Sequence, residues 1–143
     1  MVRPGREWLH GSVEVDETYV GGAATGGKRG RGAGNKEIIV IAVEVLRPKG
    51  FGCTRMCRVP DVSGDSLVPF GLAMAEPGAE ILTDGWGGYN SLSKHNYMHS
   101  RTVLSDSGDP AHVVMPDVHR IAALLKRWLL GIHQGAVSGK HLD

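Results

Sequence analysis

Apolar and polar residues alternate along residues 12–20, a pattern typical of a β-strand with one buried face. Residues 37–46 instead form a continuous run rich in Ile and Val, which predicts a central strand buried on both faces. A Pro- and Gly-containing turn at residues 47–52 leads into a third strand at residues 53–59. Three successive strands joined in this way predict an antiparallel meander.

Helices and strands are expected to alternate in the rest of the chain. We predict helices at residues 66–76, 89–95 and 118–130, and short strands at residues 79–83 and 97–103. Asp65 and Asp117 are the predicted N-caps, while Pro77-Gly78 and Gly131 are the predicted ends. The order βββ-α-β-α-β-α predicts an α/β fold with a mixed five-stranded sheet flanked by helices, and it resembles the ribonuclease H-like arrangement.

Composition narrows the class of protein. The 143 residues suit one domain, and 41% hydrophobic residues can form a modest core. No apolar run reaches the roughly 18–20 residues that span a bilayer, and the first residues lack the apolar stretch of a signal peptide. The two cysteines do not suggest a disulfide framework. We therefore expect a cytoplasmic protein with no membrane segment.

The near-zero net charge of +1 hides a basic segment, Gly21–Lys36, with seven glycines, four cations and no acid. Its cations are Lys28, Arg29, Arg31 and Lys36. Such a segment could lie along the phosphate backbone of DNA, or it could be a solvated linker between two strands.

Two aspartates stand out because of their positions. Asp16 lies in the middle of the first predicted strand, and Asp84 directly follows the fourth. A carboxylate within a strand costs desolvation free energy unless a partner compensates it, and a hard divalent cation such as Mg²⁺ is one such partner. The alternative is that Asp16 faces solvent on an edge strand and that Asp84 begins a turn.

The last predicted helix adds His119 and Lys126, which are seven residues apart. Seven residues are about two helical turns, so both side chains leave the same face, whereas Asp117 points about 200° away from His119. His119 could then face Asp84, with Lys126 reaching a substrate phosphate. Alternatively, both are surface residues of an amphipathic helix.

Trp86 and Tyr89, after Asp84, could stack on a base or pack the loop against the sheet.

The segments VEVDETYVGG, RGAGNKEIIVIAVE, VPDVSGDSLVPF, LTDGWGGY and VHRIAALLKRWLLGIHQGAVSGKHL resemble the ISXO-like family of insertion-sequence DDE transposases, in the family's order. The resemblance implies a ribonuclease H-like fold and DNA strand cleavage and transfer that depend on Mg²⁺ or Mn²⁺. By position, Asp16, Asp84 and His119 match the catalytic, metal-binding residues, and Lys126 matches the catalytic lysine. DNA would be bound by Lys28, Arg29, Arg31, Lys36, Lys126 and Arg127.

His119 departs from the family, because many relatives carry Glu or Asn at this position. A neutral histidine brings no negative charge, so we expect weaker metal binding and a preference for Mn²⁺. Residues 1–10 would be an N-terminal remnant and residues 11–143 a catalytic domain truncated at its C-terminus. The expected partners are transposon ends, target DNA and further copies of the chain. The alternatives are a truncated remnant that binds DNA or interferes with the full-length enzyme, and a nuclease of repair or recombination.

Overall fold

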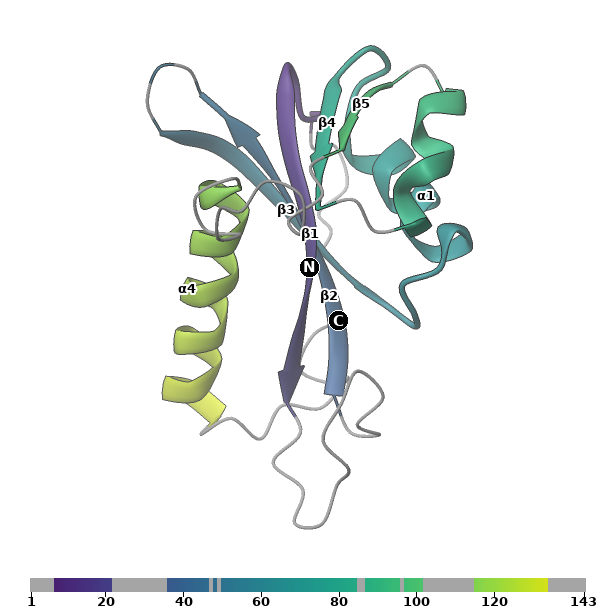
Figure 1. Ribbon diagram of the computed structural model, residues 1–143. Coiled ribbons are helices and arrows are strands. Elements are labelled where there is room, and N and C mark those ends of the chain that lie inside the picture. The colour runs from purple at the N-terminus through teal and green to yellow at the C-terminus, as the bar shows by residue number, and fades with distance from the viewer. Residues whose placement is uncertain are drawn as a thin grey trace.

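The fold was determined as a computed structural model that describes residues 7–21, 36–46, 48, 50–84, 87–95, 97–101 and 115–133 (Figure 1). The strands are β1 (Ser12–Gly21), β2 (Lys36–Val45), β3 (Phe51–Val59), β4 (Glu80–Thr83) and β5 (Met98–Arg101). The helices are α1 (Gly64–Met74), the 3₁₀ helix η1 (Gly87–His95) and α4 (Pro116–His133).

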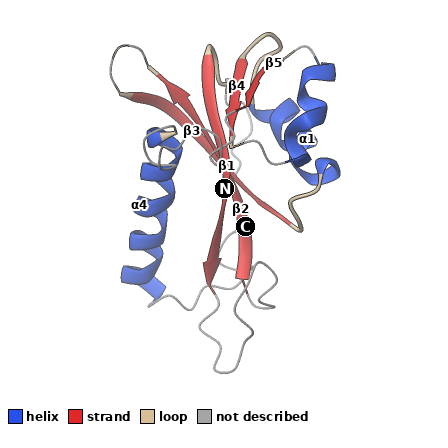
Figure 2. Ribbon diagram, in the orientation of Figure 1, coloured by secondary structure: helices blue, strands red, loops and turns tan. Residues whose placement is uncertain are grey.

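The five strands form one mixed sheet in the order β3-β2-β1-β4-β5. The predicted antiparallel meander of the first three strands is confirmed. Strand β4 pairs parallel to β1, and β5 pairs parallel to β4. Helix α4 covers one face of the sheet, and α1 lies on the other (Figures 1 and 2). The structure thus confirms the predicted α/β fold, and this arrangement is compatible with a ribonuclease H-like fold.

Strand β2 is buried on both faces, as its continuous apolar run predicts. Ile39, Ile41 and Val43 pack in the hydrophobic cluster formed with α4. Val40 and Ala42 belong to the cluster on the opposite face, formed with α1 and η1. Because successive side chains of a strand point to opposite faces, an uninterrupted apolar run can supply both cores.

The side chains of β1, the central strand, alternate between the two faces of the sheet in the same way. Val13 and Val15 pack in the α1 cluster, and Val20 packs in the α4 cluster. The even-numbered positions therefore face α4, and these include Glu14 and Asp16. The pairing of β1 with β4 stops at Glu14, but β1 lies between β2 and β4 and the Asp16 side chain is only 16% exposed. The alternative that Asp16 faces solvent on an edge strand is therefore wrong.

The start of α1 lies two residues before the predicted one. Its N-cap is Ser63, whereas Asp65, the predicted cap, lies in the first turn. Asp61 explains the earlier start, because its Oδ1 accepts hydrogen bonds from Ser63 N at 2.9 Å and from Ser66 Oγ at 2.8 Å. These bonds fix the chain just before the first helical residue.

The predicted C-terminal ends of the first and last helices are also wrong. Helix α1 ends at Met74 with Ala75 as its C-cap, before Pro77-Gly78 is reached. Helix α4 runs from Pro116 to His133, so Asp117 lies within its first turn and Gly131 lies within the helix. A single glycine costs about 1 kcal/mol relative to alanine, which packing of buried residues such as Leu129 can offset.

The 3₁₀ helix η1 begins two residues before the predicted helix, and β5 is described only through Arg101. Within the described part of the chain, no helix has both the length and the apolar character needed to cross a membrane.

Replacing a buried leucine of α4 should cost far more stability than replacing its exposed neighbour. Leu125 is 8% exposed in the core beneath α4, whereas Leu124 is 50% exposed. We expect Leu125→Ala to lower the free energy of unfolding by about 2–4 kcal/mol, because it leaves a cavity. Leu124→Ala should change it by less than about 0.5 kcal/mol. Urea denaturation measures both, and equal losses would contradict this packing of α4.

Candidate active site

Parallel pairing of β1 with β4 brings the two predicted aspartates together. The register pairs Val13 with Ile81 and Glu14 with Leu82, so continuing it by two residues sets Asp16 level with Asp84. One carboxylate oxygen each from Asp16, Glu17 and Asp84 lies within 4.8 Å of the others. Asp16 and Asp84, which are 68 positions apart in the sequence, thus form an acidic cluster with Glu17.

Glu17 was not identified from the sequence, since strict alternation places it on the face opposite Asp16. Its Oε2 accepts a hydrogen bond of 3.1 Å from the hydroxyl of Tyr89, a fully buried residue of η1. Burial and the neighbouring carboxylates, Glu17 first among them, raise the pKa of Tyr89, so the phenol remains a donor. Tyr89 therefore packs in the core, and Trp86 lies outside the described residues.

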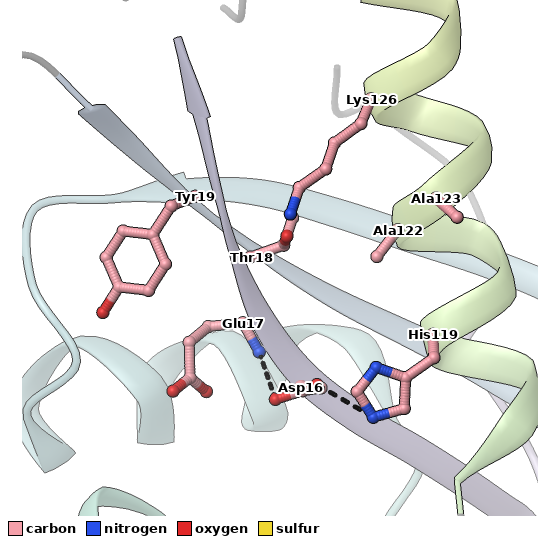
Figure 3. A pocket seen from close by; sticks show the side chains of 8 residues that line it. All are labelled: Asp16, Glu17, Thr18, Tyr19, His119, Ala122, Ala123 and Lys126. Atoms are coloured by element: carbon pink, nitrogen blue, oxygen red, sulfur yellow. Dashed lines mark hydrogen bonds and ion pairs between the residues drawn. The ribbon is translucent and has the colours of Figure 1, made fainter. Parts of the chain in front are cut away.

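Helix α4 places His119 beside the acidic cluster. Its Nε2 is 3.6 Å from Asp16 Oδ2 (Figure 3). His119, Ala122, Ala123 and Lys126 line one pocket of about 390 Å³ together with residues 16–19 of β1. The predicted common face of His119 and Lys126 is thus observed, and the two alanines between them keep the pocket open (Figure 3).

The electrostatics of the cluster favour a bound cation. Burial first, and then the charges of Glu17 and Asp84, raise the pKa of Asp16 to about 7, although the Glu17 N–H and Lys126 act in the opposite direction. The Glu17 N–H donates to Asp16 Oδ1 at 2.9 Å. A divalent cation bound by these oxygens would remove the repulsion, and hard oxygen ligands are those that Mg²⁺ and Mn²⁺ prefer. The donor set therefore fits such an ion.

Glu14 is a further acidic residue of β1 that was not identified from the sequence. It is 3% exposed, and its Oε2 accepts a hydrogen bond of 2.8 Å from the backbone N–H of Val118. The carboxylate thus meets the N-terminal turn of α4, where backbone N–H groups need acceptors and the helix dipole favours negative charge. Because His119 follows Val118, this bond anchors α4 beside Asp16.

The other predicted DNA-binding residues do not join the acidic cluster in the described part of the chain. Lys28, Arg29 and Arg31 lie outside the described residues. Lys36 is exposed and pairs with Gly21, five strand positions from Asp16, or about 16 Å at the usual rise per residue. Arg127 is exposed on α4 but does not line the pocket.

The centre of the mixed sheet thus carries an acidic cluster beside a pocket. Residues 8–143 match the ISXO2-like transposase domain. The chain therefore belongs to this family of insertion-sequence transposases. A DDE transposase family implies divalent metal use and DNA binding. No curated protein matched the chain, and no solved structure matched it.

The buried charge of Asp16 should make metal-free stability depend on pH. Its pKa of about 7 lies above its ordinary value of 3.8, so the folded protein holds the proton more tightly. The free energy of unfolding should therefore fall as the pH rises from about 4 to about 7. Asp16→Asn should be more stable than wild type by roughly 1–2 kcal/mol at pH 8, and this advantage should shrink toward pH 4.

Urea denaturation in EDTA at pH 4 and pH 8 measures this difference. Asp65→Asn, at an exposed position of α1, is the matched control. A stability difference between Asp16→Asn and wild type that is the same at both pH values would contradict the burial of a charged Asp16.

Removing the Glu14 carboxylate should loosen α4. We expect Glu14→Ala to lower the free energy of unfolding by about 1–3 kcal/mol, because the buried N–H of Val118 loses its acceptor. Glu14→Gln should cost less, since its amide oxygen can still accept that bond. Denaturation curves of the two variants test this, and an equal cost would show that the hydrogen bond is not the source of the stability.

Proposed function

We propose that this domain cleaves and transfers DNA strands at the ends of an insertion sequence, using a divalent metal ion. The observation that carries the proposal is the meeting of Asp16 and Asp84 at the centre of the sheet in a member of a transposase family. Neither aspartate is close to the other in sequence, and only the pairing of β1 with β4 joins them.

Asp16 and Asp84 would hold Mg²⁺ or Mn²⁺, and His119 would complete the site from α4. When bound, the ion supplies activation of the attacking oxygen and stabilisation of the leaving oxygen in phosphodiester chemistry. Water attacks a phosphodiester first, and the released 3′-hydroxyl then attacks the target strand, as the family resemblance implies. Lys126, which lines the same pocket, would contact a DNA phosphate.

The remaining cations would bind DNA away from the cleavage point. Lys28, Arg29, Arg31, Lys36 and Arg127 would contact the phosphate backbone, which contributes affinity rather than sequence recognition. The partners would be the transposon ends, the target DNA and further copies of the chain. These copies would form a homo-oligomer on the DNA. We place this reaction in the cytoplasm.

Loss of the Asp84 carboxylate should abolish strand cleavage. We expect Asp84→Asn to reduce cleavage of a DNA duplex carrying the element's ends by at least about a hundredfold, because metal ions contribute several kcal/mol to such reactions. Cleavage would be measured with Mg²⁺, with Mn²⁺ and in EDTA. Asp65→Asn on α1 is the matched control and should cleave like wild type. Full activity of Asp84→Asn would contradict the proposal.

A second candidate function is DNA binding without cleavage, through which the chain would interfere with a full-length transposase. His119 favours it, because this position brings no carboxylate to the site. In that case the wild-type chain would shift end-containing DNA in a gel without cutting it in either metal. It would also reduce cleavage by an active transposase of the same element.

A further inference from the structure

Glu17 stands in the acidic cluster without a role assigned by the family resemblance. Asp16 and Asp84 match family catalytic positions, and His119 takes the third, but Glu17 is an additional carboxylate within 4.8 Å of both aspartates. We propose that Glu17 is the third carboxylate ligand of the metal centre and that Tyr89 positions it. This proposal rests on the proposed function.

The end of β4 explains how Glu17 can reach the site. Strand β4 ends at Thr83 and pairs with β1 only along Ser12–Glu14. Strand β1 continues to Gly21, paired with β2 on its other edge. From Asp16 onward, the β4 side of β1 therefore carries no described strand. Side chains from both faces of β1 can turn around this open edge toward Asp84.

The negative charge that a metal site needs favours Glu17 as a ligand. A site with two aspartates and a neutral His119 has one negative charge fewer than a site with three carboxylates. Glu17 restores that charge from the strand rather than from α4. One carboxylate oxygen of Glu17 lies within 4.8 Å of one oxygen of each aspartate, so the three negative charges lie close together. Three half-buried carboxylates in such contact are costly unless a cation joins them.

Tyr89 supplies the positioning that a flexible glutamate needs. Its hydroxyl donates to Glu17 Oε2 at 3.1 Å, and its ring is fully buried in the cluster formed with α1. A ligand held by such a bond loses less side-chain freedom when the ion binds, and partners that orient ligands typically contribute 10–100-fold to metal affinity. The buried phenol thus fixes the carboxylate at the open edge of β1.

Mn²⁺ binding to the full chain without DNA tests the proposal apart from catalysis. Titration followed by electron paramagnetic resonance would give the dissociation constant of each variant. We expect Glu17→Gln to weaken Mn²⁺ binding at least about tenfold, as Asp84→Asn should. Glu76→Gln is the matched control, because this exposed glutamate pairs with His10 instead and should leave binding unchanged. Thermal unfolding in EDTA would verify that each variant folds.

Two further variants separate ligation from charge and from folding. Glu17→Asp keeps the charge but shortens the reach, so its Mn²⁺ binding should remain several-fold weaker than wild type. Tyr89→Phe keeps all three carboxylates and the ring but removes the hydrogen bond, so we expect binding to weaken about tenfold. Tyr89→Phe also tests the proposal should Glu17→Gln fail to fold.

The outcomes distinguish this proposal from the proposed function. If Asp84→Asn loses Mn²⁺ while Glu17→Gln binds like wild type, Glu17 is not a ligand, although the metal centre stands. If Glu17→Asp binds like wild type, Glu17 acts through its charge alone, and the ligation is wrong. If Tyr89→Phe binds like wild type, the positioning role is wrong. Should the wild-type chain bind no Mn²⁺, the proposed function fails as well.

Discussion

The parallel pairing of β1 with β4 is the constraint on which the site depends. It places a strand from the start of the chain beside one that follows the first helix, and it sets Asp16 level with Asp84. Hydrogen bonds between strands fix the register in whole residues, so a slip of one position would turn Asp16 toward the opposite face. The apolar neighbours Val13 and Val15 prevent that slip, because they would leave their core.

The site also needs a strand that is buried and yet acidic. Glu14 and Asp16 face α4, and Glu17 faces the side of α1 and η1, so β1 carries three carboxylates among its apolar residues. Each has a specific partner: the N-terminal turn of α4 for Glu14, His119 for Asp16, and the phenol of Tyr89 for Glu17. Buried carboxylates are stable only with such partners. The same contacts therefore hold the two flanking layers against the sheet and assemble the site.

Much of the fold could be predicted from local pattern. Alternation and apolar runs predicted the strands, the antiparallel meander of the first three and the two-sided burial of β2, because a strand's period of two is independent of its partners. The position of β4 beside β1 was not predicted. Helix ends were less accurate, since Asp61 moves the start of α1 and packing carries α4 past Gly131. Glycine and proline signals describe only local preferences, which tertiary contacts can override.

The sequence by itself determined the candidates for the site: two aspartates at strand positions, a histidine and a lysine two helical turns apart, and a family pattern along the chain. Only the tertiary structure decided what surrounds them. It brought Glu17 into the cluster with Asp16 and Asp84, and it joined Glu14 to a backbone N–H 104 residues later. The physical reason is that side-chain periodicity is a local property, whereas the meeting of carboxylates depends on strand register and on where a neighbouring strand ends.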